Sequence, residues 1–142
     1  MASSPSQRFR HARPVDPTIG RKLWRNTAIG IGNLTAWASR KAGRGSGASI
    51  RGQVITRLYP MMFAELIAGR RIAAVSGTNG KTTTTHLLAA AAETAWGTRD
   101  VVTNADGANL REGIASALSQ NVRAPVAILE TDEQIVPDMI TR

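Results

Sequence analysis

The sequence predicts an α/β fold in which a basic helical segment precedes a parallel sheet. Short apolar runs alternate with longer helical patterns in the second half of the chain, and the order strand, helix, strand, helix, strand is typical of parallel sheets with right-handed crossovers. Aromatic residues make up only 4% of the 142 residues, so the core is expected to consist of Ala, Ile, Leu and Val. A glycine-rich loop also joins the first strand to the first crossover helix.

The positive charge of the chain is concentrated in its first half. Residues 1–71 contain 13 Lys and Arg against 2 acidic residues, whereas residues 72–142 contain 5 against 8. A basic half of this kind can attract nucleic acid, anionic lipid or an acidic partner, and composition does not choose among them. No apolar run approaches the roughly 20 residues that a membrane-spanning helix needs, so a cytoplasmic protein is expected.

The first half divides into a leader and a helical segment. Residues 1–19 are polar and interrupted by proline, which predicts a disordered leader. Residues 20–69 are predicted to form a basic helical segment. It comprises an amphipathic helix over 20–42, a glycine-rich hinge over 42–49, and short helical pieces on either side of Pro60.

Residues 70–142 contain the predicted sheet. Strands are expected at 71–76, 100–104 and 125–130, with helices at 81–95 and 108–120. Three strands leave exposed edges that a complete domain rarely tolerates. This region is therefore predicted to be an incomplete domain and the chain a fragment.

The long basic helix has an apolar face. Leu23, Ile31 and Leu34 recur at helical intervals, and Trp24 and Trp37 lie on the same helix. The tryptophans either pack on the rest of the protein or hold the helix at a membrane surface.

The run "VSGTNGKTTTT" at Val75–Thr85 follows the first strand and opens the first crossover helix. Gly77 and Gly80 allow a tight turn, so backbone N–H groups can point at phosphates. Lys81 is the predicted catalytic residue, since it would reach the terminal phosphates, and Thr82 would ligate Mg²⁺. The predicted ATP-binding residues are Gly77, Thr78, Asn79, Gly80, Lys81, Thr82 and Thr83. The alternative is a glycine-rich helix start with a surface lysine.

A carboxylate at the end of the third strand would lie across from this loop, where open parallel sheets bind ligands. Glu130 holds that position and is the second predicted magnesium ligand. Asp132 and Glu133 are the next candidates. These acids could instead cap the helix that follows.

Three motifs carry a resemblance to a known family. "GTNGKT" is the phosphate loop of the Mur ligases, where Val75 in place of the usual first glycine is normal. "NADGANLREGIASAL" at 104–118 and "AILETDE" at 127–133 resemble segments of MurT subunits, the ligase half of lipid II isoglutaminyl synthase. The resemblance covers the chain from about residue 20 to its end. It implies an incomplete Mur ligase central domain with a P-loop.

The resemblance implies a function in peptidoglycan synthesis. MurT enzymes use ATP and Mg²⁺ to amidate the D-glutamate of lipid II to D-isoglutamine, with ammonia from a GatD-like glutaminase subunit. The family's second magnesium ligand falls on Glu130. The loop facing the precursor falls on Asn104, Asp106 and Asn109, although Asp106 and Asn109 could simply cap a helix.

Some family features have no counterpart in these residues. The zinc ribbon of MurT proteins needs four cysteines, and the sequence has none. The residues that activate the carboxylate and ammonia would lie beyond Arg142, so this fragment alone is expected to be inactive. The resemblance also implies contact with lipid II, and through lipid II a peripheral position at the inner face of the membrane. Nucleic acid is not expected as a partner.

Three alternatives remain open from the sequence. Another Mur-type ligase, such as a folylpolyglutamate synthase, would share the phosphate loop, although "DGANL" favours MurT. A non-catalytic nucleotide-binding module would use ATP to change a docking surface. A fragment that does not fold alone is the third.

Overall fold

The computed structural model describes residues 17–43, 47–97, 100–104 and 108–140. Residues 1–16 of the leader predicted over 1–19 and residues 44–46 of the predicted hinge lie outside these ranges. The elements, in chain order, are α2 (Ile19–Lys41), α3 (Ala48–Leu58), α4 (Met62–Ile67), β1 (Arg71–Val75), α5 (Lys81–Trp96), β2 (Val101–Thr103), α6 (Arg111–Leu118), β3 (Val126–Glu130) and α7 (Val136–Ile140).

The three strands form a parallel sheet in the order β1-β3-β2, which confirms the predicted α/β class. The central strand β3 is buried along its whole length, as its apolar sequence requires. In the pairing of β1 with β3, Val75 lies beside Glu130. The carboxyl ends of both strands therefore meet at one edge, directly before the glycine-rich loop.

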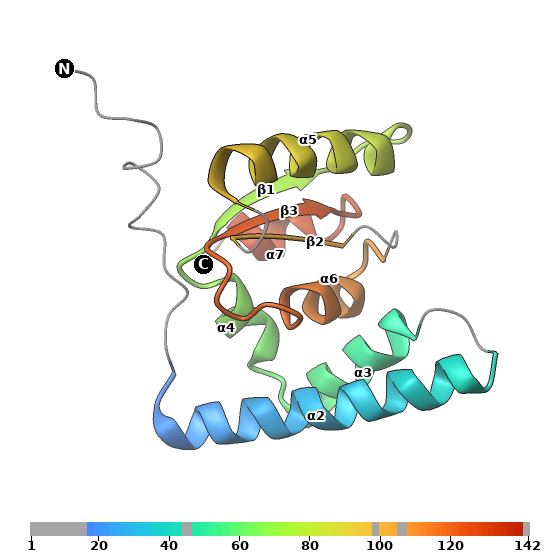
Figure 1. Cartoon of the computed structure of the whole chain (residues 1–142), viewed down its shortest axis with the longest axis vertical. Helices are drawn as coiled ribbons and strands as arrows, with labels where there is room; N and C mark the ends of the chain where they lie inside the picture. Colours follow the sequence, from blue (N-terminus) through green and yellow to red (C-terminus); the bar gives the residue numbers. More distant parts are fainter. Residues whose placement is uncertain (1–16, 44–46, 98–99, 105–107, 141–142) are drawn as a thin grey trace.

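The helices cover the sheet unequally (Figure 1). Among the helices of the described ranges, α5 alone packs on one face, where Val126 and Ile128 of β3 meet Ala89 and Ala92. Helices α4 and α6 cover the other face, α3 packs on α6, and α2 is the outermost layer. The helices of the basic segment thus share one core with the sheet.

Glycines bring the outer helix layers close together. A Cβ atom added at Gly32 of α2 would lie 2.6 Å from the Ile55 side chain of α3. One added at Gly52 of α3 would lie 1.8 Å from the carbonyl oxygen of Glu112 in α6. Because such distances exclude a side chain, the α2–α3 and α3–α6 contacts depend on glycine.

The predicted element boundaries need two corrections. Helix α3 begins at Ala48, inside the predicted hinge, because Gly47 adopts a left-handed φ of 73° and allows the chain to turn directly into a helix. Helix α6 begins at Arg111, three residues later than predicted. Pro60 separates α3 from α4 as predicted, since proline cannot continue a regular helix.

A small polar cluster joins α2 to α4 within the basic segment. The Tyr59 hydroxyl donates a hydrogen bond to Glu65, and Arg21 lies 3.7 Å from the same carboxylate oxygen. Tyr59 is buried. Burial, followed by the hydrogen bond and the charge of Glu65, raises the pKa of the Tyr59 phenol above its usual value of 10.0.

Replacing Tyr59 by phenylalanine is expected to reduce stability by about 1 kcal/mol at pH 7, because Glu65 loses a hydrogen-bond donor. A phenol whose pKa is raised in the folded state stabilises it fully below pH 10, and this contribution is lost as the pH rises through the folded pKa. The difference in melting temperature between the two proteins should therefore shrink above pH 10. Tyr59 is the sole tyrosine of the sequence, so its absorbance reports the titration directly. A difference independent of pH would contradict this account.

Candidate functional site

The loop between β1 and α5 has the backbone of an anion-binding turn. Gly77 has a φ of 144° and Gly80 a φ of 77°, values that residues with a side chain rarely adopt. The backbone N–H of Thr84 bonds to the Gly80 carbonyl, which is the first turn of α5. The N–H groups before it lie in the helical turn that has no intrahelical acceptors, so they can serve an anion.

Lys81 is the first residue of α5 and folds back over this loop. Its ammonium group donates a hydrogen bond to the Gly77 carbonyl at 2.7 Å, and the side chain is half-buried. The positive charge therefore stands at the positive end of the α5 dipole, where two like charges favour an anion between them.

Thr82 and Glu130 meet across the edge of the sheet. The Thr82 hydroxyl donates a hydrogen bond of 2.8 Å to Oε2 of Glu130. Glu130 is only 5% exposed and ends β3, so its carboxylate is fixed by the parallel pairing with β1. Two hard oxygen atoms are thus held together beside the loop, and they belong to the two residues that the sequence analysis expects to be magnesium ligands.

The other acids near this edge are placed differently. A carboxylate oxygen of Asp132 accepts the backbone N–H of Gln134, which closes a short turn after β3. Glu133 in the same turn is exposed. Within the described ranges, no three His, Cys, Asp or Glu side chains gather into a group that could hold a metal ion. Thr82 and Glu130 therefore offer two oxygen atoms to a metal ion, and a bound ligand or water would have to supply the rest of its coordination shell.

The remaining residues of the predicted ATP site line the loop and the start of α5. Thr78, Asn79 and Thr83 are exposed, so ligands can reach them. Thr85, one turn into α5, is buried instead and packs towards the sheet. The structure therefore separates the threonines of the motif into an outward group and an inward one.

Asn104 fastens the end of β2 to the end of β3. Its amide oxygen accepts the Glu130 N–H at 2.8 Å, and its amide nitrogen donates to the carbonyls of Glu130 at 2.7 Å and Ala108 at 2.9 Å. Because the oxygen and both N–H groups are engaged, Asn104 positions the backbone of Glu130. The substrate contact predicted for Asn104 would have to compete with these bonds.

Of the other two predicted substrate residues, Asn109 belongs to the described residues and Asp106 does not. Asn109 is half-buried, and its carbonyl accepts the backbone N–H of Asp132 at 3.0 Å. The backbone at Asn109 is therefore bonded to the turn that follows the Glu130 strand.

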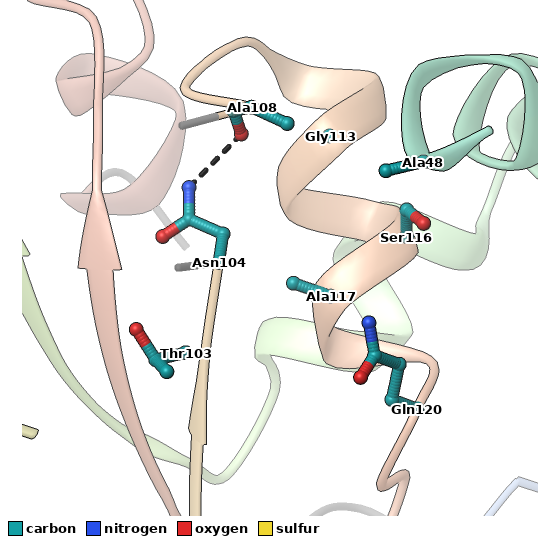
Figure 2. Close-up of a pocket in the computed structure, with 8 residues that line it drawn as sticks. All are labelled: Ala48, Thr103, Asn104, Ala108, Gly113, Ser116, Ala117 and Gln120. Carbon is teal, nitrogen blue, oxygen red and sulfur yellow. Dashed lines mark hydrogen bonds between the residues drawn. The ribbon is translucent and has the colours of Figure 1, made fainter. Parts of the chain in front are cut away.

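A pocket of about 240 Å³ opens beside Asn104, between the end of β2, α6 and the start of α3 (Figure 2). Thr103 and Asn104 line it from the strand side, whereas Ser116 of α6 and Gln120 in the turn after α6 line the opposite side. The sequence analysis did not single out Ser116 or Gln120. Small polar residues on a helix give no periodic signal, so only the fold reveals that they face the same cavity.

These features together suit the binding of a polyphosphate with a divalent cation. Turned backbone N–H groups, a lysine, and a hydroxyl facing a buried carboxylate supply the donors and the hard ligands that such a group requires. The class of protein that the fold and the site define is an α/β protein with a glycine-rich, lysine-containing loop at the carboxyl edge of its parallel sheet.

Comparison with known proteins gives the family. Residues 75–138 match the Mur ligase middle domain. The MurT subunit of lipid II isoglutaminyl synthase (glutamine-hydrolyzing) from Staphylococcus aureus is 31% identical over 117 residues, which is 80% of this chain. The MurT subunit from Streptococcus pneumoniae is 34% identical over 113 residues, or 75% of the chain. The chain therefore belongs to the Mur ligase family, and within that family it is MurT-like.

The matched region is only part of these relatives. The chain spans 26% of the Staphylococcus aureus protein and 24% of the Streptococcus pneumoniae protein. No solved structure matches the chain. Among the helices of the described residues, none is both long and apolar enough to cross a membrane.

Proposed function

We propose that this chain is the nucleotide-binding part of an ATP-dependent ligase that amidates a peptidoglycan precursor. The observation that carries the proposal is the Thr82–Glu130 contact, because it pairs a helix-start hydroxyl with a buried carboxylate beside a phosphate-binding loop. Similarity to MurT subunits supports the ligase assignment. Use of ATP would place the protein in the cytoplasm.

The Thr82–Glu130 geometry fits a magnesium ion. Adjacent ligands of an octahedral Mg²⁺ at roughly 2.0–2.1 Å from the metal are about 2.9 Å apart. The two oxygen atoms are 2.8 Å apart, so they could ligate one ion side by side with little movement. The residues present therefore fit Mg²⁺, with phosphate and water oxygens completing the shell.

In the proposed reaction, ATP supplies the phosphoryl group that activates a carboxylate for attack by ammonia. The loop from Gly77 to Lys81 would bind the phosphates through its backbone, and Lys81 would exchange its bond to Gly77 for the terminal phosphates. Glu130 and Thr82 would hold the metal that offsets the phosphate charge. Asn104 would keep Glu130 in position.

The finer assignment concerns substrate and partner. The names of the relatives describe a glutamine-hydrolyzing lipid II isoglutaminyl synthase, which supports lipid II as the substrate and a GatD-like glutaminase as the source of ammonia. The pocket beside Asn104 lies at the carboxyl edge of the sheet, as the substrate site of an open parallel sheet should. Asn109 and Asp106 flank this region in the sequence and remain the predicted substrate contacts.

Calorimetric titration of the chain with ATP, with and without Mg²⁺, tests nucleotide binding. Binding that depends on Mg²⁺ is expected, because the phosphates and the Glu130 carboxylate repel each other unless a cation lies between them. If the affinity for ATP were the same in the presence of a chelator, the proposed metal site would be refuted. Absence of binding would overturn the nucleotide site itself.

Replacing Glu130 by glutamine should weaken ATP binding about tenfold in Mg²⁺ and leave the weak binding without Mg²⁺ unchanged. An amide retains the shape of the side chain but not the charge that the cation needs. The melting temperature should not fall, since the variant removes a buried charge. Glu133→Gln is the matched control, because Glu133 is exposed in the turn that follows. An unaltered magnesium titration for Glu130→Gln would refute its role as a ligand.

Amidation is tested by incubating the chain with ATP, Mg²⁺, lipid II and an ammonium salt, so that no glutaminase is required. Mass spectrometry of lipid II then detects conversion of a carboxyl group to an amide. Amidated lipid II would support the ligase proposal for this chain. ATP binding without amidation would restrict the chain to the nucleotide-binding step.

A further inference from the structure

Helix α2 turns its large apolar side chains away from the protein. Its buried residues are the small ones, Ala28, Gly32, Ala36 and Ser39. Ile19, Leu23, Leu34 and Trp37 are exposed and fall within about 60° of one another around the helix. We call these four residues the outer face of α2. A helix that packs on α3 through small residues thus presents an unburied apolar stripe to its surroundings.

The charge of α2 restricts what can cover the outer face. The helix contains no acidic residue and five basic ones, which are Arg21, Lys22, Arg25, Arg40 and Lys41. Arg21 and Arg25 lie on the side of the buried residues, and Arg21 contacts Glu65 there. Lys41 lies within the outer face, and Lys22 and Arg40 lie about 60° from its edge, so positive charge borders the apolar stripe at both ends. A second copy would place like charges opposite each other at both ends, which disfavours self-association. A surface that covers the outer face of α2 should therefore be apolar at its centre and negatively charged at its boundary.

The two tryptophans of α2 are placed differently. The indole N–H of Trp24 donates to the carbonyl of Leu58 at the end of α3, so this ring is bonded to the protein and lies outside the outer face. The Lys41 ammonium lies 4.9 Å from the centre of the Trp37 ring. Tryptophan combined with lysine at the boundary of an apolar stripe is typical of helices that lie in the interface of a membrane.

We propose that α2 lies on an anionic lipid surface, with its outer face among the acyl chains and Lys22, Arg40 and Lys41 at the headgroups. The arrangement in Figure 1 places α2 at one extreme of the molecule and α5, with the phosphate loop, at the other. The less basic half of the chain, residues 72–142, then faces away from the lipid charge. This proposal does not depend on ATP binding or on the ligase assignment.

Sedimentation with vesicles tests the proposal. The chain should bind vesicles of phosphatidylcholine that contain phosphatidylglycerol, and bind much less to phosphatidylcholine alone. Raising the ionic strength from about 0.1 M to about 1 M shortens the screening length from roughly 10 Å to 3 Å, so binding should weaken. Tryptophan emission should shift to shorter wavelength on binding, because Trp37 leaves water.

A matched pair of variants isolates the outer face. Leu34→Glu is expected to reduce binding to anionic vesicles about tenfold, since a charge replaces an apolar anchor. Leu87→Glu on α5 introduces the same change at a similarly exposed site, with Leu87 69% and Leu34 64% exposed, and should bind as the parent does. Both sites are exposed, so neither variant should lower the melting temperature substantially.

Three results would overturn the proposal. Failure to bind either kind of vesicle would mean that something other than lipid covers the outer face. Equal losses in Leu34→Glu and Leu87→Glu would show that net charge alone governs binding. Binding to a DNA duplex that is stronger than binding to vesicles, and is insensitive to Leu34→Glu, would assign the basic residues to nucleic acid.

Discussion

Replacing Lys81 by alanine is expected to weaken ATP binding roughly 100-fold, equivalent to about 3 kcal/mol. Lys81 would contribute charge-assisted hydrogen bonds to the terminal phosphates, and alanine supplies neither charge nor donor. In the absence of nucleotide, Lys81 bonds to the Gly77 carbonyl. This bond must break before Lys81 reaches the phosphates, so its absence in the variant does not weaken ATP binding. The loss should still exceed that of Glu130→Gln, because Lys81→Ala removes both the charge and the donors that contact ATP directly.

Calorimetry with ATP in Mg²⁺ measures this change. Lys41→Ala is the control, because Lys41 lies at the end of α2, on the layer farthest from α5. Its affinity for ATP should equal that of the parent. A thermal melt of Lys81→Ala should stay within about 1 kcal/mol of the parent, since the side chain is only half-buried. Undiminished affinity in a folded Lys81→Ala protein would exclude the loop as the phosphate site.

Replacing Gly52 by alanine should produce the largest loss of stability, about 3 kcal/mol or more. The added methyl group would lie 1.8 Å from the carbonyl oxygen and 2.4 Å from the carbonyl carbon of Glu112. Both are backbone atoms of α6, so no side-chain rotation can relieve the clash. Helices α3 and α6 would have to separate, and the core that they share with the sheet would open.

A thermal melt should show a fall of about 10 °C for Gly52→Ala. Gly30→Ala is the matched control, because Gly30 lies inside α2 and an added Cβ would have no neighbour within 4 Å beyond the adjacent residues and backbone of its own helix. That variant should gain up to about 1 kcal/mol from helix propensity. If both variants melted at the parent temperature, the close contact between α3 and α6 would be refuted.

The sequence predicted the strands and the glycine turn before α5 well, because both depend on local pattern. The apolar run at Val126–Glu130 and the glycines at 77 and 80 carry their own structural signals. The pairing of Thr82 with Glu130 was also anticipated from the end of the strand. The order of the strands in the sheet was not predicted, because no local pattern shows that β3, the third strand along the chain, lies at the centre of the sheet.

The role of Asn104 shows where sequence reasoning about the site stopped. A polar residue after a strand predicts a substrate ligand, but it does not show that the amide also bonds to the backbone of Glu130, 26 residues away. Only the fold brings these residues together. For the same reason, the apolar periodicity of α2 predicted a helix but did not reveal that the small residues Gly32 and Ala36 are the ones that pack inward.

The central position of β3 has a consequence for the order in which the protein folds. Within the described sheet, β1 and β2 pair only with β3, which follows both of them along the chain. During synthesis, neither strand has a hydrogen-bonding partner until residue 126 and its successors emerge from the ribosome. The α2–α3 contact can form earlier, since it joins neighbouring helices. Helices should therefore assemble first on the nascent chain, and the phosphate loop should acquire its shape only when the last strand is inserted.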